Sequence, residues 1–110
     1  MVGRIAAAAC LICLLSSADP AAQVSAPAHQ IRIASFRFVP AADTVRVGQS
    51  VTFGNEDLVP HTATADDSTR KFESGTIAAN GTWRFTARRK GVMSYHCRFH
   101  PTMRGTLVVR

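Results

Sequence analysis

Three residues with metal-binding side chains recur at every third position near the C-terminus: Cys97, His100 and Met103. A thiol, an imidazole and a thioether, joined by a second imidazole, form the donor set that holds copper in electron-transfer proteins. The three residues lie between two apolar segments, 92–96 and 105–109, which are predicted to be strands. A short loop between two strands can bring all three side chains to one ion.

The fourth donor is expected from a different strand, so that metal binding joins distant parts of the chain. His61 meets this requirement, because it follows a polar turn that comes after the apolar segment 51–53. His96 does not, although it precedes Cys97 directly. Alternate residues of a strand point to opposite faces, so a strand that turns Cys97 inward turns His96 outward. The predicted ligands are therefore His61, Cys97, His100 and Met103.

Two motifs resemble those of the cupredoxins. An Asn is followed a few residues later by Pro-His within residues 55–61, and residues 95–105 have the form Tyr-His-Cys-x-x-His-Pro-x-Met-Arg-Gly. The short spacing from Cys to His to Met is similar to that of the amicyanin-like members, and a looser resemblance extends over residues 31–109. The resemblance implies a cupredoxin-like copper-binding domain over residues 29–110. It also implies one copper ion held by His61, Cys97 and His100, with Met103 as a weak axial ligand.

The same resemblance implies contacts around the ligands. The backbone N–H of Thr62 should donate to the sulfur of Cys97, and the side chain of Asn55 should tie neighbouring loops. The family more often has Asn in place of Thr62, so the side-chain contact of this residue stays open.

The surface around His100 is where electrons are expected to leave the site. In this family the edge of the imidazole emerges through an apolar patch, for which the candidates here are Pro60, Phe99 and Pro101. Amicyanin-like sequences usually have Pro in place of Phe99, and the alternative interpretation of Phe99 is an ordinary loop residue. Arg98 and Arg104 flank the same histidine and are predicted to contact a partner protein.

Residues 1–18 have the pattern of a signal peptide. Arg4 supplies a positive charge, residues 5–15 are apolar, and small residues precede a cleavage point after Ala18. The apolar run is too short to span a bilayer. A core helix of a cytosolic protein fits less well, because the run has no polar face, and a lipoprotein signal at Cys10 has too little apolar sequence before it. Residues 19–28 are expected to form a flexible N-terminal arm, and the mature domain is predicted to be periplasmic, without a membrane span.

Removal of this leader would also remove two of the three cysteines, Cys10 and Cys13. The remaining Cys97 has no partner for an internal disulfide, so it is an inert buried thiol, an intermolecular link or a ligand. The regular spacing of His100 and Met103 favours a ligand.

The chain is basic, with 13 Lys and Arg against 7 Asp and Glu and a formal net charge of +6. Without the leader, 12 basic residues remain against 7 acidic ones, a charge of +5. Such a domain is expected to meet partners with an acidic docking surface faster than neutral ones. Nucleic acid is not an expected partner, because the sequence shows neither a basic helix nor basic residues interleaved with aromatic ones.

Residues 29–110 contain about seven short segments with strand-like alternation and no convincing helix, which indicates an all-β, Greek-key β-sandwich in one monomeric domain. The alternation slips between Ala34 and Ser35, which predicts a β-bulge there and places Phe36 and Phe38 on one face. Asn80-Gly81 predicts a tight turn.

Together these features predict a one-electron carrier with a type 1 copper site. An enzyme with Cys97 as nucleophile would need an open substrate site, whereas this side chain is predicted to point inward. The alternative is a copper carrier or buffer protein with no electron-transfer partner, which could use the same ligands. The resemblance implies redox proteins as partners, namely a quinone-cofactor amine dehydrogenase, a c-type cytochrome, or both.

Overall fold

The structure is a computed structural model that describes residues 3–4, 29–67 and 72–110. Apart from residues 3 and 4, the predicted signal peptide and N-terminal arm lie outside the described residues. Within the described parts of the chain, no helix is long and apolar enough to cross a membrane.

The described residues form eight strands, one more than the approximate number predicted. The strands are β1 (His29–Ala34), β2 (Arg37–Val39), β3 (Ala42–Val45), β4 (Ser50–Asn55), β5 (Thr64–Ala65), β6 (Thr82–Thr86), β7 (Gly91–His96) and β8 (Arg104–Val109). A turn divides the predicted first strand into β1 and β2, which raises the number of strands. Two strands are short: β2 has three residues and β5 has two.

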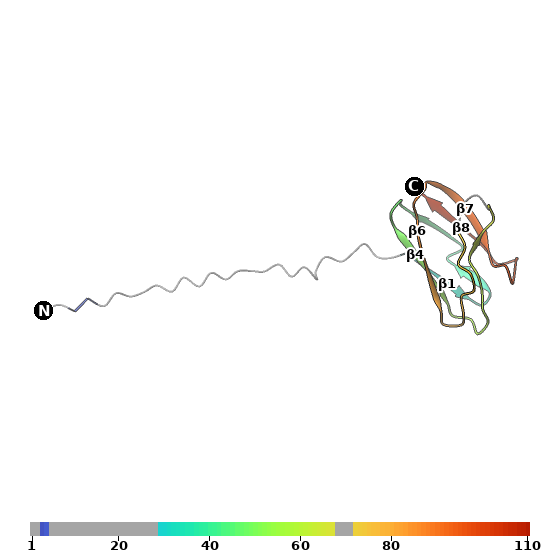
Figure 1. Ribbon diagram of the computed structural model, residues 1–110, viewed down its shortest axis with the longest axis horizontal. Helices are drawn as coiled ribbons and strands as arrows, with labels where there is room; N and C mark the ends of the chain where they lie inside the picture. Colours follow the sequence, from blue (N-terminus) through green and yellow to red (C-terminus); the bar gives the residue numbers. More distant parts are fainter. Residues whose placement is uncertain (1–2, 5–28, 68–71) are drawn as a thin grey trace.

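Two four-stranded sheets make up the sandwich, in the orders β2-β1-β4-β6 and β3-β8-β7-β5. Figure 1 shows β7 and β8 side by side in one layer, with β1, β4 and β6 in the other. Two pairs are parallel, β1 with β4 and β3 with β8, while the other pairs are antiparallel. Neighbouring strands are therefore often distant in sequence. The two four-stranded sheets confirm the all-β sandwich predicted from the short alternating segments.

The prediction of a β-bulge at Ala34 and Ser35 is wrong. Ala34 pairs with Arg37, so Ser35 and Phe36 form a two-residue hairpin turn between β1 and β2. Both turn residues have positive φ, 51° and 59°, as a type I′ turn requires. In consequence Phe36 does not share the buried face of Phe38: Phe38 is 3% exposed and Phe36 is 48% exposed.

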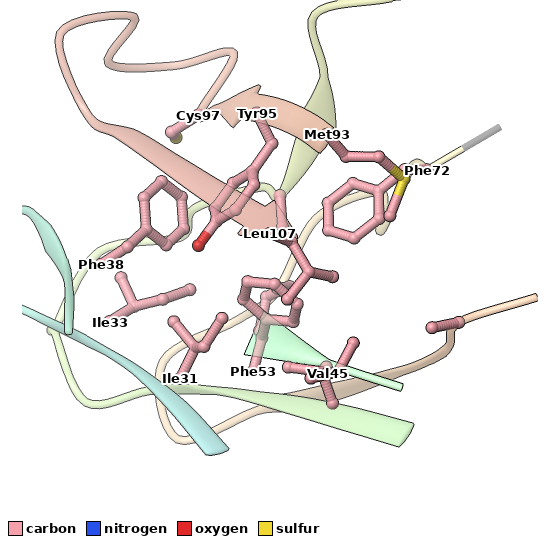
Figure 2. Close-up of a cluster of buried hydrophobic side chains, with 14 of the residues drawn as sticks. Ile31, Ile33, Phe38, Val45, Phe53, Phe72, Met93, Tyr95, Cys97 and Leu107 are labelled. Atoms are coloured by element: carbon pink, nitrogen blue, oxygen red, sulfur yellow. The ribbon is translucent and has the colours of Figure 1, made fainter. Parts of the chain in front are cut away.

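Aromatic side chains occupy the centre of the core. The ring of Tyr95 lies between Phe38 and Phe72, at centroid distances of 4.8 and 5.4 Å (Figure 2). Phe53, on the opposite sheet, meets Tyr95 edge to face at 5.5 Å. Such edge-to-face pairs stabilise a core beyond the area they bury. Trp83, together with Phe85, is only half-buried and packs against the outside of this group.

Tyr95 lies directly across the sheet from Gly105, its partner in the β7–β8 register. A Cβ atom added at Gly105 would lie 2.2 Å from the ring and hydroxyl of Tyr95, so only glycine leaves room for this ring. Burial, with a smaller effect from the charge of Asp43, raises the pKa of Tyr95. The tyrosine is therefore a neutral core residue that fixes β8 beside β7.

Candidate metal centre

One end of the sandwich collects the segments that carry the predicted ligands. Strand β4 ends at Asn55, β7 ends at His96 and β8 begins at Arg104. Because β1 runs parallel to β4 with Ile33 opposite Asn55, the turn after β1 reaches the same end. Loops from both sheets therefore meet there.

Three of the four predicted ligands come together at this end. One ligand atom from each of His61, Cys97 and His100 lies within 4.8 Å of the other two. The Cys97 sulfur and Nδ1 of His61 are 3.7 Å apart. His61 and Cys97 are fully buried. Met103, the fourth predicted ligand, is 3% exposed and belongs to the same loop.

The loop that carries three of these residues is closed by its own backbone. The N–H of Cys97 donates to the carbonyl of Met103 at 3.1 Å, and the N–H of Met103 donates to the carbonyl of His100 at 2.9 Å. Cys97 itself continues the inward face of Met93 and Tyr95, as Figure 2 shows. The period of two in β7 thus determines that the thiol points inward. His96 points away and pairs its Nδ1 with Asp66.

His61 is held at both its backbone and its ring. Its N–H and carbonyl exchange hydrogen bonds with Ile77, at 3.1 and 2.7 Å. Nε2 lies 2.8 Å from Oδ2 of Asp57, and an ionised carboxylate only accepts, so Nε2 carries the ring proton. Nδ1 then has a free lone pair on the side of Cys97, which is the state that a metal ligand needs.

Asp57 stays ionised in this position. Burial opposes its charge, but hydrogen bonds from the N–H of Phe36, the ring of His61 and the N–H of Ser35 together outweigh burial and lower the pKa of Asp57. The fixed negative charge is therefore available next to His61 at neutral pH.

The hydrogen bond predicted between Thr62 and Cys97 is present in the structure, with the N–H of Thr62 3.4 Å from the sulfur. The side chain of Thr62 also has a role that the sequence left open: its Oγ1 accepts from the N–H of Arg98 at 2.9 Å. The segment that carries His61 is therefore linked to the Cys97 loop twice.

Asn55 ties loops together, as the resemblance implied. Its Nδ2 donates to the carbonyls of Val59 and Ile77 at 2.9 and 3.0 Å, and its Oδ1 accepts from the N–H of Asp57 at 2.9 Å. The side chain is 2% exposed. It sets the path of the turn that leads to His61.

The predicted docking residues lie at the surface, but the two arginines are not isolated charges. Phe99 is 50% exposed, and Pro101 is exposed beside it. Arg98 donates to Glu73 at 3.0 Å, and Arg104 donates to Asp66 at 3.2 Å. These ion pairs lie largely in solvent, so each partly cancels the charge that an approaching partner meets.

Sequence reasoning missed two residues of the centre, Asp57 and Phe36. The Phe36 ring meets the rings of His61 and His100 edge to face, at centroid distances of 5.3 and 4.9 Å. Phe36 gave no signal, because Ser-Phe is not a typical hairpin turn. The acidic Asp57, four residues before His61, was the available signal. Two exposed apolar residues that lie between Asp57 and His61, Leu58 and Val59, were also missed.

The donor set fits a copper ion. Nδ1 of His100 is buried and has no hydrogen-bond partner in the described part of the chain, and His100 belongs to the same cluster as Cys97. A buried imidazole nitrogen without a hydrogen-bond partner is costly, and a bound metal ion would satisfy it. One thiolate and two imidazoles, with a thioether in the same loop, match the preference of copper rather than of calcium or magnesium.

Comparison with known proteins gives the same picture. The sequence model of the cupredoxin-like domain family matches residues 5–109 of this chain. A Cu(I) structure of an amicyanin variant is 28% identical, with a TM-score of 0.72 over 82% of this chain and 89% of that one. A purple cupredoxin from Nitrosopumilus maritimus is 26% identical, with a TM-score of 0.68 over 74% of this chain and 99% of the other. No curated protein matches the chain.

One of the similar solved structures is an enzyme, and its likeness to this chain shows the fold alone. The copper-containing nitrite reductase from Thermus scotoductus is 23% identical, with a TM-score of 0.72, over 79% of this chain but 23% of the reductase. Amicyanin, which the chain matches over most of both lengths, is not an enzyme. The fold, the convergent His-Cys-His group and the match over nearly the whole sequence agree, and the chain belongs to the cupredoxin-like domain family.

Proposed function

We propose that this protein is a periplasmic one-electron carrier with a single type 1 copper site. The observation that carries the proposal is the convergence of His61, Cys97 and His100 within 4.8 Å, in a setting where Nε2 of His61 is engaged and Nδ1 of His100 is not. Met103 is the proposed fourth, weaker ligand. The predicted signal peptide supports the location, and the protein is proposed to act as a monomer.

The chain's own residues supply rigidity and a dry site. Copper, when bound, supplies a one-electron couple, and this couple exchanges fastest when its ligands move little. Thr62 donates to the Cys97 sulfur, Asn55 fixes the turn before His61, and Asp57 holds the ring of His61. Burial of Cys97 and His61 excludes water from the donors. These contacts hold the same donor positions for both oxidation states.

Electrons are proposed to enter and leave through His100, which is partly exposed and meets the ring of Phe36 edge to face. The apolar side chains Phe99 and Pro101 would contact the partner, and Arg98 and Arg104 would frame the contact. The partners are redox proteins, and the resemblance to amicyanin favours a quinone-cofactor amine dehydrogenase, a c-type cytochrome, or both. An acidic docking surface is favoured, because the chain is basic.

Stopped-flow mixing of the reduced, copper-loaded protein with an oxidised c-type cytochrome tests the function. We expect the copper colour to appear as the haem is reduced, with all copper still bound to the protein afterwards. A copper carrier gives the opposite result, in which copper passes to an acceptor protein or chelator and electron exchange is negligible. Copper content after gel filtration distinguishes the two.

The arginine pair gives a prediction about rate. In an Arg98→Ala/Arg104→Ala variant, electron exchange with an acidic partner should slow at low salt, because Glu73 and Asp66 lose their cations and add repulsion. The rate should also fall less steeply as salt is added. Arg88→Ala/Arg89→Ala, in the loop before β7 at the other end of the sandwich, is the matched control. Equal salt slopes in both variants would assign the first pair to solubility alone.

Met103→Leu tests the fourth ligand. The exchange nearly conserves volume in a buried position, so the free energy of unfolding should change by less than about 1.5 kcal/mol. The colour should remain and the reduction potential should rise, since loss of a thioether donor disfavours Cu(II) more than Cu(I). Met93→Leu, at a buried methionine outside the ligand loop, should leave the potential as it is. If both variants have the wild-type potential, Met103 is not a ligand.

A further inference from the structure

One carboxylate joins the His61 segment to the β1–β2 turn. Oδ1 of Asp57 accepts from the N–H of Ser35 at 2.7 Å, and Oδ2 accepts from the N–H of Phe36 at 2.9 Å. Oδ2 also accepts from Nε2 of His61 at 2.8 Å. The side chain of Asp57 is 14% exposed. Both oxygens are thus used, and they connect two segments that are more than twenty positions apart in the sequence.

The β1–β2 turn has no local feature that explains its shape. Its two central residues have φ values of 51° and 59°, a region that suits Asn and Gly and disfavours a bulky side chain such as Phe36. One carboxylate accepts hydrogen bonds from two consecutive N–H groups, and these bonds stabilise this backbone from outside. Asp57 therefore replaces the turn chemistry that Ser35 and Phe36 do not provide.

The turn places the ring of Phe36 over the two histidines. Its centroid is 4.9 Å from that of His100 and 5.3 Å from that of His61, with interplanar angles of 82° and 87°. The opposite side of the ring faces solvent, since Phe36 is 48% exposed. Phe36 thus lies between solvent and the two imidazoles.

We propose that Asp57 is a positioning residue that fixes the ring of His61 for metal binding and, through the β1–β2 turn, holds Phe36 as a cover over His100. The inference rests on the proposed copper site. To the loops that carry His61 and Cys97 it adds a third, the β1–β2 turn. Asp57 acts on the ligand ring and on its cover at the same time, so loss of its carboxylate changes both.

Asp57→Asn tests the first part in the metal-free protein. Nitrogen NMR of the His61 ring should show the proton on Nε2 in the wild type and a shift toward Nδ1 in the variant, whose amide can donate to Nε2. Copper affinity, measured by competition with a chelator, should fall about 10–100-fold. Asp43→Asn is the matched control, because Asp43 pairs with the ring of His29 at 3.0 Å in β1 and β3. The same His61 tautomer and copper affinity in both variants would overturn the proposal.

Phe36→Gly tests the second part, since glycine suits the positive φ while the whole side chain with its ring is removed. Transfer of copper from this variant to a chelator should be several-fold faster than from the wild type, while the proton on His61 stays on Nε2. A wild-type transfer rate would show that Phe36 is no cover.

Amide hydrogen exchange of the wild type serves if a variant does not fold. Binding of Cu(I) should slow exchange at Ser35 and Phe36, because the carboxylate that accepts from both is also held by a fixed His61. Unchanged exchange on binding contradicts the coupling. Failure of Cu(I) to bind at all would instead contradict the copper site, and the tautomer of the metal-free protein would still test Asp57.

Discussion

Replacement of Cys97 by serine is expected to abolish the strong red absorption of the Cu(II)-loaded protein, because this absorption comes from the bond between Cu(II) and a thiolate. The fold should survive, since serine can still accept the hydrogen bond from the N–H of Thr62. Absorption and copper content of the purified domain, recorded together, measure the effect.

The control for this change is His96→Gln, next to Cys97 but paired with Asp66 on the outer face of β7. It should keep the colour. Copper should also raise the free energy of unfolding of the wild type, by about 4 kcal/mol when free copper is about 1,000 times Kd. For the Cys97→Ser variant the increase should be much smaller. A Cys97→Ser protein with the wild-type colour contradicts the ligand set.

The second large effect is expected at Gly105, which pairs with Tyr95 across β7 and β8. Gly105→Ala places a methyl group where the ring of Tyr95 lies, 2.2 Å from its nearest atoms. That ring is enclosed by Phe38 and Phe72 and has little room to move. We expect a loss of about 1–3 kcal/mol or more in the free energy of unfolding, which lowers Tm by roughly 10 °C in a domain of this size.

Gly54→Ala is the matched control, because a Cβ added to this glycine of β4 has no atom within 4 Å. Its Tm should stay within a few degrees of the wild type. Thermal unfolding of the metal-free proteins measures both, so that copper binding does not mask the difference. Equal Tm values for the two variants would mean that Tyr95 moves aside at little cost.

Much of the site was predictable because it depends on local periodicity. The spacing of Cys97, His100 and Met103 lies within one loop, and the period of two in β7 determines that Cys97 points inward while His96 points outward. The burial of Met93, Tyr95 and Cys97 agrees with that period. Local pattern also indicated the all-β sandwich, since alternation of apolar and polar residues over a few positions is enough to predict each strand.

The β1–β2 turn was not predictable from local sequence. The slip in alternation at Ser35 was visible, but a bulge and a two-residue turn both produce such a slip. What selects the turn is Asp57, a residue from another loop, through hydrogen bonds to two N–H groups. A contact over such a separation leaves no trace in the periodicity of either segment, so Phe36 was placed on the wrong face.

The ion pairs of the arginines were hidden for the same reason. Sequence showed Arg98 and Arg104 beside His100 but could not show that Glu73 and Asp66 reach them from the segment after His61. Net charge alone therefore overstated the positive potential near the histidine. The remaining attraction of an acidic partner depends on the whole surface of the domain.

A crystal structure of the copper-loaded protein, solved in the oxidised and the reduced state, tests the central claim most directly. We expect one copper ion in both states, bound to Nδ1 of His61, the sulfur of Cys97 and Nδ1 of His100, with the sulfur of Met103 at a longer distance. The protein ligands should have the same positions in the two states. Copper bound elsewhere, or a ligand loop that rearranges on reduction, would contradict the proposed electron carrier.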